Sequence, residues 1–159
     1  MERISKYLSY LECVKSETAI RKGIDNTPNE AQKAAMIHVA STIFDALREI
    51  VKGPLHASSF FRSPELNVAI GGAKNSQHCK GEAIDIDCDK FGNGDNKMIF
   101  YLLKHDFTFD QLIWEFGDDD HPEWVHVSLV DERVAGRKNR GEVLRAFRTQ
   151  EGETKYIPF

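Results

Sequence analysis

The sequence predicts an α+β fold in a single domain, residues 1–159, in which a small antiparallel sheet is flanked by helices. Three observations carry this prediction. A chain of 159 residues is of the size that typically forms one domain. Segments with helical spacing of apolar residues are interspersed with segments that alternate apolar and polar residues. No internal repeat, low-complexity tract or long linker divides the chain.

Two amphipathic helices are expected in the first third of the chain. Apolar residues spaced three or four apart predict a helix from Ile4 to Ile20. A second helix is expected to begin at Thr27-Pro28, with Thr27 as the cap and Glu30 returning a bond to the cap backbone. Its apolar stripe continues to Ile50, and Gly53-Pro54 ends it.

The remaining two thirds of the sequence mix strands and short helices. Period-two alternation places Asp85 on one face of a strand and its neighbours Ile84 and Ile86 on the other. A polar turn-forming segment separates two apolar runs, which predicts a hairpin. The expected strands are 55–61, 83–87, 111–116 and 124–129, and the expected helices begin at Ser63-Pro64, span 97–104 and lie around 143–147.

Composition excludes several classes of function. The chain carries 21 Lys+Arg and 25 Asp+Glu, a formal net charge of −4, without a basic cluster, so we expect no nucleic-acid partner. No apolar run approaches the ~20 residues that a membrane helix needs, so no membrane association is expected. The segment 1–6 lacks the apolar core of a signal peptide, and three cysteines form no closed disulfide set, which together predict a cytoplasmic protein with reduced thiols.

Two histidines and one carboxylate form a candidate metal site. His78 precedes a predicted strand, Asp85 lies on that strand, and His126 lies within an otherwise apolar strand. Two histidines and a carboxylate, with water in the fourth position, are a frequent ligand set of catalytic zinc. By spacing alone, each residue could instead be a hydrogen-bonded core histidine or a turn aspartate. Asp87 shares the face of Asp85 and is a candidate for orienting a ligand histidine.

Several separate motifs resemble the zinc D-alanyl-D-alanine carboxypeptidase family. The sequence Ser76-x-His78-x-x-Gly81-x-Ala83-x-Asp85, followed by Trp124-x-His126, is similar to the family's metal-binding pattern. The segments 24–29, 61–67, 70–72 and 109–113 resemble its small, often phage-encoded branch and occur in the same order. The resemblance implies a fold shared with sonic hedgehog and, more distantly, with lysostaphin-type enzymes.

Site residues follow from this resemblance. It implies that His78, Asp85 and His126 hold one Zn²⁺ per chain. Such a site needs a carboxylate that takes a proton from the metal-bound water and returns it to the leaving amine. Glu115, which ends a predicted strand, is favoured modestly over Glu123, which matches the E-x-x-H form of other family members.

Two further residues are implied on the substrate side. Arg62 is expected to bind the substrate carboxylate or the tetrahedral oxyanion, with a surface salt bridge as its alternative role. Ser76 is expected to help hold the substrate, although it could equally be a turn residue. Gly81 is expected to let its loop pass close to the site.

The implied activity is hydrolysis of peptide bonds in bacterial peptidoglycan, of the D-Ala-D-Ala or L-Ala-D-Glu type. A phage endolysin is the favoured role: a monomer that stays in the cytoplasm until a holin opens the membrane, and then acts on the cell wall. The alternative is a catalytically inactive binding module or virion structural component that keeps the fold and the zinc.

Overall fold

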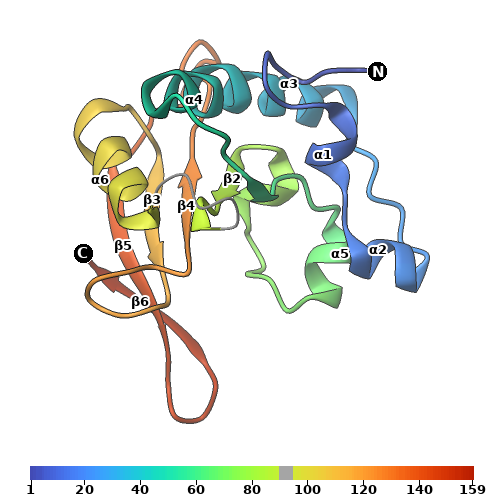
Figure 1. Ribbon diagram of the computed structural model, residues 1–159. Helices are drawn as coiled ribbons and strands as arrows, with labels where there is room; N and C mark the ends of the chain where they lie inside the picture. Colours follow the sequence, from blue (N-terminus) through green and yellow to red (C-terminus); the bar gives the residue numbers. More distant parts are fainter. Residues whose placement is uncertain (90–94) are drawn as a thin grey trace.

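A six-stranded sheet forms the centre of the computed structural model, which describes residues 1–89 and 95–159 (Figure 1). The strand order is β1-β2-β4-β3-β5-β6. All neighbouring strands are antiparallel except β3 and β5, which are parallel. This confirms the predicted α+β class and adds one parallel pair to the expected antiparallel sheet. The strands are β1 (Ala57–Ser59), β2 (Ala83–Ile86), β3 (Gln111–Glu115), β4 (Trp124–Ser128), β5 (Glu142–Arg148) and β6 (Thr154–Pro158).

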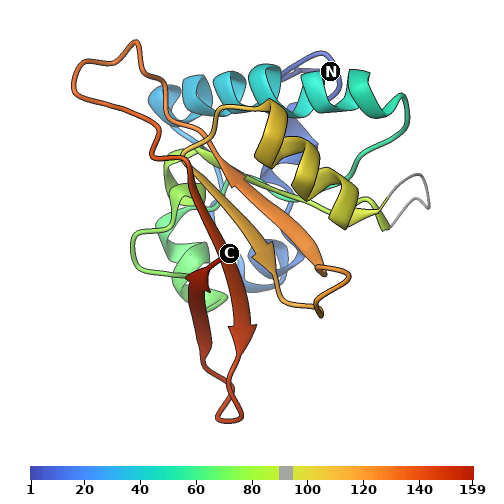
Figure 2. The ribbon, with the colours of Figure 1, turned by 90° about the vertical axis from the view of Figure 1, so that its left-hand side faces the viewer.

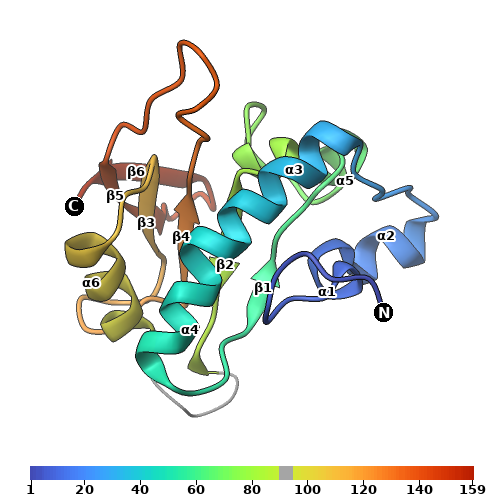
Figure 3. The same cartoon turned by 90° about the horizontal axis from the view of Figure 1, so that it is seen from above.

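The helices vary in length, and three of them run without interruption. Segments α3, η1 and α4 follow one another as a single rod, with a π-helical stretch at η1 (Figure 3). The helices are α1 (Tyr10–Val14), α2 (Glu17–Lys22), α3 (Glu30–Val39), η1 (Ala40–Phe44), α4 (Asp45–Val51), α5 (Pro64–Ala69), the 3-10 turn η2 (Gln77–Lys80) and α6 (Asn96–Asp106). Within the described residues, no helix is both long and apolar enough to cross a bilayer.

The two faces of the sheet differ in chemistry, as the alternation of the strands requires. Leu112, Trp114 and Val125 are almost completely buried on the face that packs against the helices. That core also contains Phe44 from the helical rod and Phe100 from α6. Asp85, Glu115 and His126 occupy the alternate positions of their strands and therefore point to the opposite face. The helical rod and α6 thus cover one face of the sheet, and the polar side chains gather on the other.

The N-terminal segment differs from the predicted single helix. Ser9 and Ser16 each cap a new short helix, so two helices, α1 and α2, replace the single element expected over 4–20, and α2 continues to Lys22. Before α1 the chain is irregular, with a bridge between Arg3 and Ser9. The side-chain oxygen of each serine accepts a hydrogen bond from a backbone amide in the first turn of the helix that it caps. This local stabilisation outweighs the loosely spaced apolar residues that predicted one continuous helix.

The start of the long helix is also shifted by two residues. Asn29, not Thr27, is the cap, and its partner in the capping box is Gln32 instead of Glu30. The pattern Asn-x-x-Gln offers the same reciprocal bonds as the predicted pair. The helix end near Gly53-Pro54 agrees with the prediction.

The C-terminal prediction was wrong, because residues 143–147 lie in a strand. β5 pairs with β3 on one side and β6 on the other, and β5 and β6 form a long hairpin that extends beyond the rest of the sheet (Figure 2). Pairing on both edges outweighs a weak local helical pattern, because it satisfies the strand's backbone groups along its length. The strand expected over 55–61 is likewise reduced to Ala57–Ser59, with an irregularity in its pairing.

Candidate metal centre

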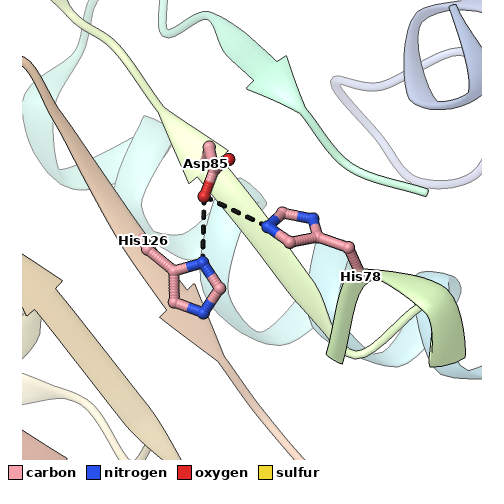
Figure 4. A group of neighbouring side chains, drawn as sticks. All are labelled: His78, Asp85 and His126. Carbon is pink, nitrogen blue, oxygen red and sulfur yellow. Dashed lines mark hydrogen bonds and ion pairs between the residues drawn. The ribbon is translucent and has the colours of Figure 1, made fainter. Parts of the chain in front are cut away.

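Three side chains from separate segments meet on the polar face of the sheet (Figure 4). Asp85 Oδ1 lies 3.2 Å from His78 Nε2 and 3.0 Å from His126 Nδ1. Asp85 and His126 are direct partners in the β2–β4 register, and η2 brings His78 to them. One ligand atom of each residue lies within 4.8 Å of the others, and no other group of three or more such residues within 1–89 and 95–159 could hold a metal ion.

A hydrogen bond on the side of the ring away from the cluster fixes the orientation of His78. Its Nδ1 is 2.6 Å from the backbone carbonyl of Phe60, so Nδ1 carries the proton that is donated to this oxygen. The unprotonated Nε2 then faces the cluster. It is fully buried and makes no hydrogen bond of acceptable geometry, although Asp85 is close. A buried lone pair directed at a carboxylate is unfavourable unless a cation lies between them.

Electrostatics favour the ligand forms of these residues. Burial lowers the pKa of His78, which keeps its imidazole neutral. Burial alone would raise the pKa of Asp85, but its interactions with His78 and His126 outweigh burial and hold the pKa well below its usual range. Metal ions bind neutral imidazole and ionised carboxylate, which are the forms that these shifts favour for His78 and Asp85.

The two candidate glutamates occupy different environments. Glu115 is buried, ends β3 and lines the same cavity as Asp85 and His126. Burial raises the pKa of Glu115 to about 7, and the nearby charge of Asp85 contributes to this rise. Glu123 is exposed, directly precedes β4 and is not among the residues that line the cavity. Only Glu115 therefore shares the cavity with the cluster.

Arg62 and Ser76 both line this cavity, whose volume is about 1160 Å³. The backbone amide of Arg62 donates to the carbonyl of His78, which ties the arginine to the cluster. Its Nη1 makes a long hydrogen bond to Asn67, 3.4 Å, while its Nε is buried without a partner. No salt bridge of Arg62 occurs within residues 1–89 and 95–159, so the structure does not bear out the alternative of a surface ion pair.

Comparison with known protein families agrees with this geometry. The model of the family Peptidase M15 matches residues 6–128, which is more than half of the chain. The chain belongs to the Peptidase M15 family. It is therefore a peptidase, and the predicted resemblance to the zinc D-alanyl-D-alanine carboxypeptidases is confirmed at the level of this family. A search of curated proteins found no match to the chain.

The donor set fits the divalent ion on which Peptidase M15 enzymes depend. Two imidazoles and one carboxylate suit zinc, and the buried, unpartnered His78 Nε2 is the atom that a bound cation would satisfy. In this Peptidase M15 chain the partner that orients the candidate ligand His78 is the backbone carbonyl of Phe60, not Asp87 as predicted. Asp87 instead accepts hydrogen bonds from Asn96 and from the amide of Asp89.

Residues outside the span matched by Peptidase M15 also reach the cavity, and the sequence analysis did not identify them. Tyr156 of β6 lines it, and burial raises its pKa, helped by the charges of Glu115 and Asp85. Arg148 and Leu144 of β5 contribute as well. The segment 143–147, for which the sequence predicts a short helix, shows no clean polar–apolar alternation that would have indicated a strand.

Proposed function

We propose that this Peptidase M15 member is a zinc-dependent peptidase that hydrolyses peptide bonds of bacterial peptidoglycan. One observation carries the proposal: His78, Asp85 and His126 converge beside Glu115 on a sheet face that opens into a large cavity. Peptide substrate is implied by the family, and the cell-wall class is implied by the similarity of the motifs to D-alanyl-D-alanine carboxypeptidases.

The protein's residues divide the work of hydrolysis between them. His78, Asp85 and His126 would hold the zinc ion, which when bound supplies a water of pKa near ~7 and polarises the scissile carbonyl. Glu115 is the general base in this proposal. A carboxyl group whose pKa burial raises to about 7 can take a proton from water and return it to the leaving amine near neutral pH.

Arg62 has the role of an anion-binding group beside the cluster. Its buried Nε lacks a partner, and a guanidinium held there can accept the substrate's terminal carboxylate or the developing oxyanion. Ser76 lies at the same cavity wall and would hold the substrate chain. Glu123, exposed and outside the cavity, is assigned no part in the chemistry.

The experiment is incubation of the purified protein with muropeptides, with zinc, with chelator, and with zinc restored. We expect cleavage that chelator abolishes and zinc restores, and mass spectrometry of the products identifies the bond, D-Ala-D-Ala or L-Ala-D-Glu. Zinc bound stoichiometrically without any cleavage would overturn the enzymatic proposal and favour a catalytically inactive binding or virion structural module.

Matched variants test the assignment of the base. Glu115→Gln removes the proton acceptor and is expected to lower kcat by a factor of about 10²–10⁴. Glu123→Gln, the same substitution at an exposed position, is expected to retain activity within about twofold, as surface substitutions usually have small effects. The reverse pattern would transfer the role to Glu123.

The biological role we propose is that of a phage endolysin acting as a monomer. The protein would remain in the cytoplasm until a holin opens the membrane and would then reach the cell wall. Expression in a bacterial host should leave cells intact, while co-expression with a holin should lyse them. Lysis without holin, or intact cells with it, would contradict this role.

A further inference from the structure

The β5–β6 hairpin forms one wall of the cavity, although it lies beyond residues 6–128 that the family match covers. Alternate residues of the hairpin face the cavity: Leu144 and Arg148 on one side, Thr154 and Tyr156 on the other. The segment 70–78 also lines the cavity. The hairpin projects past the other strands, so it extends the surface available to a substrate (Figure 2).

The register of the sheet places the hairpin next to the candidate catalytic residues. Glu115 pairs with Ala146, and Ala146 pairs with Tyr156, so these three residues form one row. The row is two residues from the one that contains His126, and it therefore points to the same face. Arg148 follows Ala146 by two residues and shares that face.

Arg148 is held over an aromatic ring and has no salt-bridge partner among the residues that the structure describes. Its guanidinium carbon lies 4.7 Å from the centre of the Phe116 ring, and Phe116 packs edge-on against Trp124. The backbone of Phe116 has a positive φ of 56°, which is uncommon for a residue other than glycine. In the described part of the chain no carboxylate forms a salt bridge with Arg148, whereas Arg140 at the same cavity is neutralised by Asp110 and Glu142.

The charges of the cavity wall favour an anion. The chain as a whole is acidic, with net charge −4, yet Arg62, Lys74 and Arg148 line this cavity without acidic partners among residues 1–89 and 95–159. The carboxylates that face it, Asp85 and Glu115, are those of the candidate metal centre. These positive charges would attract a carboxylate on a substrate, but they would not attract an ammonium group or a neutral peptide.

We propose that Arg148 binds a carboxylate on the peptide substrate, at a point remote from the group held by Arg62. The two arginines flank the cluster from opposite sides, since Arg62 follows β1 and Arg148 ends β5, at the other end of the strand order. β5 is two strands from β4, or ~10 Å across the sheet, and Arg148 lies four residues, or ~13 Å, along the strands from the row of His126. The backbones are therefore ~17 Å apart, which an extended peptide covers in about five residues before the length of the arginine side chain is subtracted. Arg148 therefore makes the enzyme selective for an acidic side group several residues from the cleaved bond. This inference rests on the proposed function, because it requires a peptide in the cavity.

The probe is a pair of synthetic peptides, L-Ala-γ-D-Glu-L-Lys-D-Ala-D-Ala with either a free α-carboxylate or an α-carboxamide on its glutamate. The two differ by one charge and share the same terminal carboxylate. Binding is measured by amide shifts in NMR titrations of the chelator-treated full chain, in which metal-dependent cleavage cannot consume the peptide. We expect the acid to bind about three- to tenfold more tightly than the amide, as a partly exposed charge-assisted contact allows.

Three variants complete the test. Arg148→Gln should abolish the preference for the acid, and Arg148→Lys, which keeps the charge, should retain part of it. Arg133→Gln removes an exposed arginine that pairs with Asp131 outside the cavity, and should leave the preference unchanged. Equal binding of the two peptides by the unmodified chain, or a preference that survives Arg148→Gln, would overturn this inference alone. Failure to bind either peptide would overturn it together with the proposed function.

Discussion

At the scale of single residues, the chemistry of the candidate centre depends on the interactions that each side-chain atom already makes. His78 Nδ1 donates a hydrogen bond to the Phe60 carbonyl, and this directs Nε2 into the cluster. The two histidines keep Asp85 ionised in a buried setting. Glu115 lacks such partners, so burial dominates and raises its pKa to about 7. Neighbouring carboxylates thus differ in protonation because only one of them lies between two imidazoles.

Glu115 should make the metal-free protein less stable as the pH rises. A carboxyl group with a pKa of 4.5 when unfolded and about 7 when folded binds more protons in the folded state between these values. Its contribution is therefore fully present below pH 4.5 and is lost as the pH rises through 7. Glu115→Gln removes this dependence, so after chelation the variant should gain stability over the unmodified chain, on the order of 3 kcal/mol, between pH 4.5 and 8.

Urea unfolding at several pH values measures this difference. Glu123→Gln, at an exposed position, serves as the control and should follow the pH dependence of the unmodified chain. If the Glu115→Gln and unmodified curves run parallel across this range, Glu115 is not buried as a neutral acid in the metal-free state.

At the scale of elements, the turn that carries His78 is fixed to the helical rod at Gly81. Gly81 has φ of +72°, and a Cβ at this position would lie 2.4 Å from the carbonyl oxygen of Gln32 in α3. Its amide also donates to the carbonyl of His78. The close approach at Gly81 is therefore to a helix backbone, and it fixes the position of η2 against α3.

Gly81→Ala should lower the free energy of unfolding by more than ~2 kcal/mol, because a left-handed conformation and a backbone clash both oppose it. Gly136→Ala measures the cost of the left-handed conformation alone, since Gly136 has φ of +77° and a Cβ there would meet nothing within 4 Å. We expect it to cost only about 1 kcal/mol.

Competition with a chromogenic chelator measures the zinc affinity of the two variants. The affinity should fall for Gly81→Ala and not for Gly136→Ala, because of these two glycines only Gly81 contacts His78. Equal losses of stability and affinity in both variants would show that the contact with α3 contributes little.

At the scale of the whole molecule, metal binding should stabilise the folded chain. The proposed ligands come from η2, β2 and β4, and they meet only when the sheet is formed. Free Zn²⁺ at about 100 times Kd should add about 2.7 kcal/mol, which for a domain of this size corresponds to a rise of Tm of roughly 5–10 °C.

Differential scanning calorimetry with zinc and with chelator measures this rise. Asp85→Asn should abolish it, because the carboxylate ligand is lost. His121→Asn should keep it, because His121 is a loop residue paired with Asp89 and lies outside the cluster. A zinc-induced rise that survives in Asp85→Asn would place the metal elsewhere.

The sequence by itself determined the alternating strands around Asp85 and His126, because period-two burial is a local property of a strand. It also supplied the motifs by which the family was recognised before any contact was known. Asp85, His126 and Glu115 share the polar face that their strand positions imply.

Only the tertiary structure decided which other residues join them. Tyr156 and Arg148 reach the cavity because β5 pairs in parallel with β3 and carries β6 beside it, a pairing between segments far apart in the sequence. The buried state of Glu115 and the exposed state of Glu123 likewise follow from how the β3–β4 connection folds back. Local patterns fix which face of an element a side chain occupies, whereas long-range pairing and burial fix its neighbours and its charge.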